Sequence, residues 1–222
     1  HGLSGSAADD PEHVQIAAEQ LPCVFHVSAR TVSTHALNIF GDHSDVMACR
    51  QTGFAMLCEG NVQEVMDLSP VAHLAALSGK VPFINFFDGF RTSHEIQKIA
   101  VWDYKDLADM CDMDAVKAFR EHALNPEHPA MRGSHENGDT FFQHREACNQ
   151  YYDALPEVVE KYMGKINEKL GTDYKLFNYY GAPDADRVII AMGSICDVAE
   201  EVIDYLNAHG EKVGLIKVRL YR

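Results

Sequence analysis

Paired metal-binding cysteines are absent from this 222-residue sequence, whose six cysteines are scattered singly without a C-x-x-C pair. Iron–sulfur clusters and zinc ribbons use such pairs, so we expect neither in this chain and interpret the cysteines as reduced, mostly buried thiols. The 12 histidines also lack an H-x-x-x-H or H-E-x-x-H spacing, which would place two imidazoles on one helical face. We therefore predict no metal ligands in this chain.

Positive charge is scarce as well, because 19 Lys and Arg residues stand against 33 Asp and Glu residues and give a formal net charge of -14. Nucleic acids and anionic membranes bind positive surfaces, so this charge argues against both as partners. No apolar run approaches the roughly 20 residues of a membrane span, and no basic-then-apolar leader is present. The expected location is the cytoplasm.

Hydrophobic residues make up 46% of the chain, which is enough for a sizeable core in one or two domains. The chain starts at His1 rather than Met, and the residues that follow form an acidic leader of linker-like composition. It ends at Arg222, directly after a predicted strand. We therefore expect a fragment of a longer protein, whose unpaired strand edges would make it aggregation-prone.

Predicted strands and helices alternate along the chain, the pattern of an α/β fold. The predicted strands are 23–27, 53–58, 81–87, 187–192 and 213–219, and the predicted helices include 62–77, two within 104–124, 155–170 and 197–208. Pro70 predicts a break or a kink, and Gly79 suits a left-handed cap. Another helix is expected to begin at Glu95, with Thr92 or Ser93 as its cap.

Residues 125–149 carry two prolines and two glycines among polar residues and are too long for an ordinary loop. Such an excursion tends to be functional or to wrap a partner. From about 171 to 184 the composition shifts to turn residues and aromatics, and a β-α-β unit follows. Only Gly193 of a G-x-G-x-x-G dinucleotide motif is present there, so we interpret this unit as the start of a second α/β domain.

Arg30 is the best candidate for a site residue. It follows a predicted strand in the run Ser28-Ala29-Arg30, so a guanidinium stands where an apolar run surfaces. In open α/β sheets, ligands bind beyond the carboxyl ends of strands. A guanidinium keeps its charge at any working pH and binds a carboxylate or phosphate through two parallel hydrogen bonds, which predicts a site for a small anion.

Two polar clusters surround this candidate. His35, Asp42, His43 and Asp45 follow Arg30, although each of the four is individually more often a solvated loop residue than a ligand. The second cluster, 88–95, follows the predicted strand 81–87. Two clusters at strand ends on one face of a sheet predict a cleft.

Long segments of the sequence resemble pyruvate:ferredoxin (flavodoxin) oxidoreductase. The segments that carry the resemblance are Ser28-Ala29-Arg30, 35–45, Arg50-Gln-Thr-Gly-Phe-Ala-Met-Leu57, 62–64, 71–74, Pro82-Phe-Ile-Asn-Phe-Phe-Asp-Gly-Phe-Arg-Thr-Ser-His-Glu-Ile-Gln-Lys98, 125–129, 132–133, 181–184, 192–194 and 214–222. The resemblance covers nearly everything from about Leu21 to the end, and motifs of this length are specific.

The resemblance implies a domain plan. Residues 1–20 would be an atypical leader, and 21–172 part of a thiamine-enzyme pyrimidine-binding domain, a parallel sheet with helices on both faces. Residues 173–222 would begin a transketolase-C-terminal-like α/β domain, truncated here.

The resemblance also implies a function, the oxidative decarboxylation of pyruvate to acetyl-CoA and CO2 by a homodimer that contains further domains. Such an enzyme uses thiamine diphosphate, Mg2+ and [4Fe-4S] clusters, and it passes electrons to ferredoxin or flavodoxin and the acetyl group to coenzyme A. Arg30 matches the family's arginine that binds the pyruvate carboxylate, so it is the predicted catalytic and substrate-binding residue. The main cofactor ligands would lie outside this chain, which should be inactive alone.

Two alternatives stay open. One is a fragment of a related 2-oxoacid oxidoreductase with another substrate, which the pyruvate-type matches disfavour. The other is a catalytically inactive scaffold piece, which would require the 222 residues to be the complete natural product.

Overall fold

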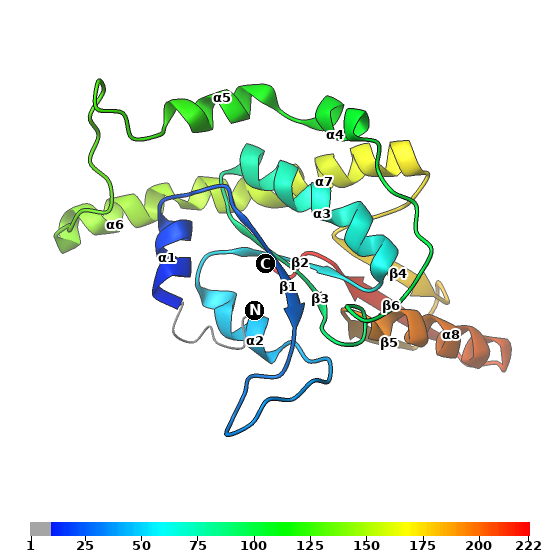
Figure 1. Ribbon diagram of the computed structural model, residues 1–222. Coiled ribbons are helices and arrows are strands. Elements are labelled where there is room, and N and C mark those ends of the chain that lie inside the picture. Colours follow the sequence, from blue (N-terminus) through cyan, green and yellow to red (C-terminus); the bar gives the residue numbers. More distant parts are fainter. Residues whose placement is uncertain (1–9) are drawn as a thin grey trace.

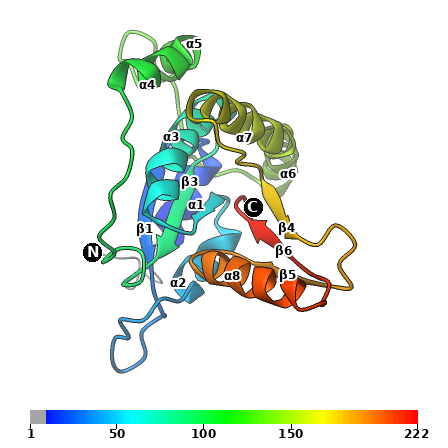
Figure 2. The same ribbon diagram turned by 90° about the vertical axis from the view of Figure 1, so that its right-hand side faces the viewer.

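The structure, a computed structural model, describes residues 10–222 and contains two three-stranded sheets flanked by helices (Figures 1 and 2). The helices are α1 (Asp10–Ala18), α2 (Ser44–Ala48), α3 (Val62–Gly79), α4 (Tyr104–Met110), α5 (Met113–Glu121), α6 (Gly138–Ala147), α7 (Asn149–Leu170) and α8 (Ile195–Ala208). The strands are β1 (Val24–Ala29), β2 (Ala55–Glu59), β3 (Phe83–Asp88), β4 (Phe177–Gly181), β5 (Arg187–Ala191) and β6 (Val213–Val218). The predicted α/β class is confirmed.

The first sheet is parallel, with strand order β1-β3-β2. Helices α3 and α7 cover one face with an apolar core, and α1 and α2 cover the other. Every residue of β2 is buried, as expected for a strand covered on both sides. Because the strands are parallel, β1 and β3 end side by side, with Ala29 paired to Asp88.

Helix α3 runs unbroken through Pro70, so a break at this proline is wrong, and a kink there stays a prediction. A proline leaves the carbonyl four residues before it without its helical hydrogen bond. In this helix that carbonyl belongs to Met66, and it accepts a hydrogen bond from the indole N–H of Trp102 at 3.1 Å. An outside donor thus replaces the missing one.

The left-handed cap of α3 is Lys80, with φ 55°, rather than Gly79. Gly79 is the last residue of the helix and is buried. A Cβ at this position would lie 3.0 Å from Cδ1 of Leu155 on α7. The glycine therefore permits the close packing of α3 against α7 rather than ending the helix.

The helix predicted to begin at Glu95 is absent, because 95–103 forms neither helix nor strand. Thr92 is buried with an unpartnered hydroxyl, and the Ser93 hydroxyl accepts from the backbone N–H of Phe90, so neither caps a helix there. Gln63 on α3 instead fixes this segment by bonding both backbone groups of Ala100. The long excursion 125–149 contains α6, which the sequence did not predict.

The second sheet has the order β4-β6-β5. Strands β5 and β6 are parallel and joined by α8, which confirms the predicted β-α-β unit. Strand β4 is antiparallel to β6 and was missed, because the sequence around it reads as turns and aromatics.

Residues 219–222 join the two sheets by pairing with β2. The N–H of Cys58 bonds the carbonyl of Arg219 at 2.8 Å, and the N–H of Tyr221 bonds the carbonyl of Met56 at 2.9 Å. The second unit is therefore tied by backbone to the centre of the first core.

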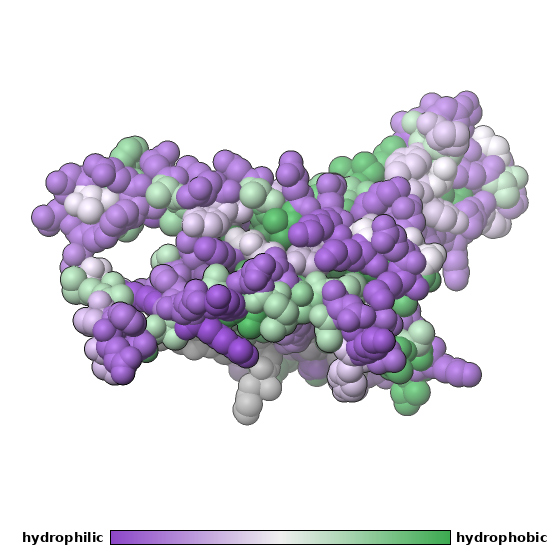
Figure 3. Space-filling model, turned by 90° about the horizontal axis from the view of Figure 1, so that it is seen from above, coloured by the Kyte–Doolittle hydropathy of each residue, from purple (hydrophilic) through white to green (hydrophobic). Residues whose placement is uncertain are grey.

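Residues 1–9 of the predicted leader lie outside the described residues. Helix α1 covers the next part of the leader, and its Ala17 is buried in the first core. The face seen from above is mostly hydrophilic, in keeping with the acidic composition (Figure 3). None of the helices within residues 10–222 has the length and apolar character that a membrane crossing requires.

Candidate functional site

A cleft of about 900 Å³ lies where β1 and β3 end, and it brings together the two polar clusters expected from the sequence. Its lining residues come from the loop after β1, the turn after β3 and the start of α8: Phe40, Gly41, Asp42, His43, Ser44, Met47, Asp88, Phe90, Arg91, Met192, Ser194 and Ile195. The sequence did not predict the contribution of α8, because it lies about a hundred residues further along the chain. The cleft therefore needs both sheets.

Arg30, directly after β1, lies beside this cleft next to Gly41 but is not one of its lining residues. Its backbone forms an isolated bridge with Gly41, and its side chain lies against Gly89. The guanidinium is partly buried and has no hydrogen bond or ion pair with any other residue of 10–222. A positive group with free donors beside a cleft is suited to binding an anion.

His43 and Asp88 form the polar centre of the cleft. The Nε2 atom of His43 lies 2.5 Å from Oδ1 of Asp88, and the backbone N–H of Ser194 donates to Oδ2, also at 2.5 Å. Burial alone would raise the pKa of Asp88, but the hydrogen bonds from His43 and Ser194 outweigh it and lower the pKa. Asp88 therefore carries its charge and links the start of α8 to the first sheet.

The other predicted residues have different places. Asp45 is buried behind Arg30, and burial raises the pKa of its carboxyl. Asp42 accepts from the backbone N–H of Ser44 at 2.5 Å, and its hydrogen bonds to Ser44 lower its pKa. His35 lies on the exposed loop outside the cleft lining, with its Nδ1 3.4 Å from the Thr34 hydroxyl.

The second predicted cluster, 88–95, also lies only partly in the cleft. Arg91 lines the cleft, whereas His94 and Glu95 are exposed and are not part of its lining. The Nδ1 atom of His94 lies 2.9 Å from the Ser93 hydroxyl. Only the first half of this cluster belongs to the site.

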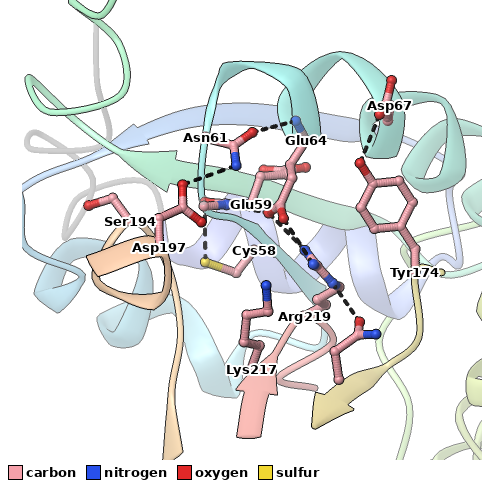
Figure 4. A network of polar contacts seen from close by, with 12 residues as sticks. Cys58, Glu59, Asn61, Glu64, Asp67, Tyr174, Ser194, Asp197, Lys217 and Arg219 are labelled. Atoms are coloured by element: carbon pink, nitrogen blue, oxygen red, sulfur yellow. Dashed lines mark hydrogen bonds and ion pairs between the residues drawn. The ribbon is translucent and has the colours of Figure 1, made fainter. Parts of the chain in front are cut away.

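A network of polar contacts, partly buried, was missed by the sequence analysis (Figure 4). Glu64 and Arg219 form a two-fold ion pair, and the Asn61 side chain donates to Asp197 at 3.1 Å. Glu59 is fully buried, and burial followed by the charge of Glu64 raises its pKa well above the usual range. The residues come from both units without a shared motif, so only the fold reveals the network.

The fold defines an α/β domain with a cleft at the carboxyl ends of a parallel sheet, the edge at which such folds bind ligands. A family model described as "Pyruvate flavodoxin/ferredoxin oxidoreductase, thiamine diP-bdg" matches residues 4–164, and one described as "Pyruvate:ferredoxin oxidoreductase core domain II" matches 185–222. The first match covers more than half of the chain, so the chain belongs to the pyruvate flavodoxin/ferredoxin oxidoreductase family. The match begins within residues 1–20, which the sequence analysis interprets as an atypical leader. The domain boundaries stay a prediction.

Individual relatives agree with this assignment. The chain is 63% identical to the pyruvate-flavodoxin oxidoreductase of Enterobacter agglomerans and 62% identical to the pyruvate:ferredoxin oxidoreductase of Moorella thermoacetica, each over 212 residues. Each match spans 96% of this chain but 18% of the relative. A solved 2-oxoglutarate:ferredoxin oxidoreductase from Magnetococcus marinus shares the fold, with a TM-score of 0.58 and 18% identity over 93% of this chain and 39% of that one.

Proposed function

We propose that this chain is the part of a pyruvate:ferredoxin (flavodoxin) oxidoreductase that holds the substrate carboxylate, and that Arg30 binds it. The observation that carries the proposal is the Arg30 guanidinium, which has no partner among residues 10–222, on a residue that pairs with Gly41 of the cleft lining. The complete enzyme would convert pyruvate to acetyl-CoA and CO2 in the cytoplasm, pass electrons to ferredoxin or flavodoxin, and act as a homodimer.

The thiamine diphosphate, Mg2+ and [4Fe-4S] clusters of such an enzyme would be held mainly by other domains. Within residues 10–222, no group of three His, Cys, Asp or Glu side chains could hold a metal ion together. The family model that matches residues 4–164 is described as thiamine-diphosphate-binding, but we assign no single residue of this chain to that cofactor. The role that we propose for a residue of this chain is the orientation of the substrate.

Arg30 would fix the carboxylate through two parallel hydrogen bonds and so set the direction of the bond that breaks on loss of CO2. Binding the carboxylate too strongly in the ground state would slow its departure, because only interactions stronger in the transition state accelerate the reaction. Orientation is thus the main role of Arg30, with electrostatic acceleration secondary.

The test is Arg30→Lys in the complete enzyme that contains this sequence. Lysine keeps the charge but loses the planar two-point contact, so the KM for pyruvate should rise and kcat should fall. Arg120→Lys on the exposed surface of α5 is the matched control and should change neither constant. Unchanged constants for Arg30→Lys would overturn the proposal, and activity with another 2-oxoacid but not with pyruvate would favour a related oxidoreductase.

A further inference from the structure

Asp45 contacts Arg30 in a way that leaves the arginine side chain free. Its Oδ2 atom accepts from the backbone N–H of Arg30 at 2.9 Å, and its Oδ1 atom accepts from the N–H of Val46 at 2.6 Å. The backbone N–H of Asp45 in turn donates to the Arg30 carbonyl at 3.4 Å. Arg30 is therefore held through both of its backbone groups.

This arrangement differs from an ion pair between the two residues. Both carboxylate oxygens of Asp45 are engaged by backbone N–H groups, and no contact between the carboxylate and the Arg30 guanidinium is present within residues 10–222. A carboxylate that paired with the guanidinium would occupy the donors an anionic substrate needs. Asp45 fixes the backbone and leaves those donors unoccupied.

Burial strengthens the hold on the backbone. Asp45 is 2% exposed, and it lies at the start of the short helix α2 with Val46, which is fully buried. Hydrogen bonds between a carboxylate and backbone N–H groups are among the stronger ones, and water has little access to compete for them here. The position of the Arg30 Cα is therefore set by the core.

Gly89, directly after the neighbouring strand β3, leaves room for the side chain of the same arginine. A Cβ on Gly89 would lie 2.5 Å from the Ala29 carbonyl oxygen, 2.7 Å from Cγ of Arg30 and 2.9 Å from its Nε. The N–H of Gly89 also donates to that carbonyl at 2.7 Å. The absence of a side chain at residue 89 thus creates the space that the Arg30 side chain occupies.

We infer that Asp45 and Gly89 are positioning residues for Arg30, Asp45 by holding its backbone and Gly89 by leaving room for its side chain. The inference rests on the proposed function of Arg30 as the carboxylate-binding residue. Neither residue touches the substrate. Both act through the direction in which the guanidinium points.

The experiment is a double-mutant cycle in the complete enzyme, with Asp45→Asn, Arg30→Lys and the pair. Asparagine keeps the shape of Asp45 but offers one acceptor and one donor, so one of the two N–H groups loses its partner. We expect the KM for pyruvate to rise about tenfold in Asp45→Asn, with a smaller change in kcat. In the Arg30→Lys background the same change should have little further effect, because residues that act through one group are not additive.

A second readout separates positioning from general damage to the fold. Inhibition by oxamate, which carries a carboxylate, should weaken in Asp45→Asn and in Gly89→Ala, whereas inhibition by the neutral pyruvamide should not change. Asp103→Asn is the matched control, because Asp103 also accepts a backbone N–H, that of Lys105, but does not line the cleft and does not contact Arg30, so the variant should keep the parent constants.

The possible outcomes are distinct. If Arg30→Lys itself leaves the KM for pyruvate unchanged, the proposed function fails and with it the basis of this inference. If Arg30→Lys raises the KM while the effect of Asp45→Asn is absent, or adds in full to that of Arg30→Lys, the proposed function stands and the positioning role is wrong. Equal losses of oxamate and pyruvamide binding would likewise reduce Asp45 to a structural role.

Discussion

Glu64 and Arg219, 155 positions apart in the sequence, form a two-fold ion pair with N–O distances of 2.7 and 2.9 Å. Their side chains are 10% and 6% exposed. Glu64 also accepts from the backbone N–H of Gly60, and Arg219 lies 4.9 Å from the ring centre of Tyr174. The pair joins the start of α3 to the residue after β6, next to the residues that pair with β2 (Figure 4).

Breaking this pair from one side should destabilise the whole chain. Glu64→Gln leaves the buried guanidinium of Arg219 without its counter-charge, and removing one partner of a buried pair costs about 3–5 kcal/mol. The measurement is urea unfolding at pH 7. The control is Glu121→Gln in the pair with Lys117, whose side chains are mostly exposed and which should be worth about 0.5 kcal/mol or less.

Replacing both partners gives the sharper result. If Glu64→Gln lowers the free energy of unfolding no more than the Glu121→Gln control does, the buried pair does not hold the two units together. If the pair does, Glu64→Leu combined with Arg219→Met should be less damaging than either change alone, because no charge is then left buried.

Glu59 should make stability fall as the pH rises. Its folded-state pKa is raised, by burial first and by the charge of Glu64 second, so the folded chain keeps a proton that the unfolded chain releases above about pH 4.3. The stability contribution is complete below that unfolded pKa. It is then lost at about 1.4 kcal/mol per pH unit until the folded-state pKa is reached.

Glu59→Gln tests this dependence, because glutamine resembles the protonated acid and does not titrate. In denaturant unfolding from pH 4 to pH 8, the free energy of unfolding of the variant should rise relative to that of the parent as the pH rises. The two values should be closest at pH 4. Parallel stability curves for the parent and the variant would contradict a raised pKa at this residue.

The hydrogen bond from Trp102 should stabilise α3 only because Pro70 is present. Trp102→Phe keeps most of the ring but removes the N–H that satisfies the Met66 carbonyl. Leaving a partly buried acceptor without its partner should cost about 1–3 kcal/mol in denaturant unfolding. In the Pro70→Ala background the helix supplies its own N–H, so the same change should cost clearly less, and equal costs in both backgrounds would disprove the compensation.

The sequence predicted the part of the site that depends on local order. Arg30 after an apolar run and the polar residues after β3 follow from the rule that parallel strands end at one edge of a sheet, and the structure places both there. Asp45 was a candidate ligand, but its actual contact is with backbone N–H groups, which no residue pattern distinguishes from binding a ligand.

Long-range relationships were not predictable in this way. Gly79 looked like a helix cap because glycine favours a positive φ, yet its role depends on Leu155, which lies on another helix. Ser194 and Arg219 come from the second unit, and their partners are fixed only when 219–222 pairs with β2. Such contacts arise from packing between units rather than from local sequence.

Asp88 should make the connection between the two units sensitive to acid. Its pKa is lowered because the hydrogen bonds from His43 and Ser194 outweigh the effect of burial. A carboxyl with a lowered folded-state pKa stabilises the fold above its unfolded pKa of about 3.9, and this contribution is lost as the pH falls through the folded-state value. The link between the start of α8 and the first sheet should therefore weaken at low pH.

Asp88→Asn should remove this dependence. The asparagine side chain can accept only one of the two hydrogen bonds, so we expect a loss of about 1.5–3 kcal/mol at pH 7 in denaturant unfolding. The difference from the parent should begin to shrink below about pH 4, where Asp88 of the unfolded parent takes up a proton, and should disappear as the pH falls through the lowered folded-state pKa. Asp173→Asn, at an exposed residue paired with Lys175, is the control and should show no such difference. A loss that stays constant down to pH 2 would mean that Asp88 contributes through its shape rather than through its charge.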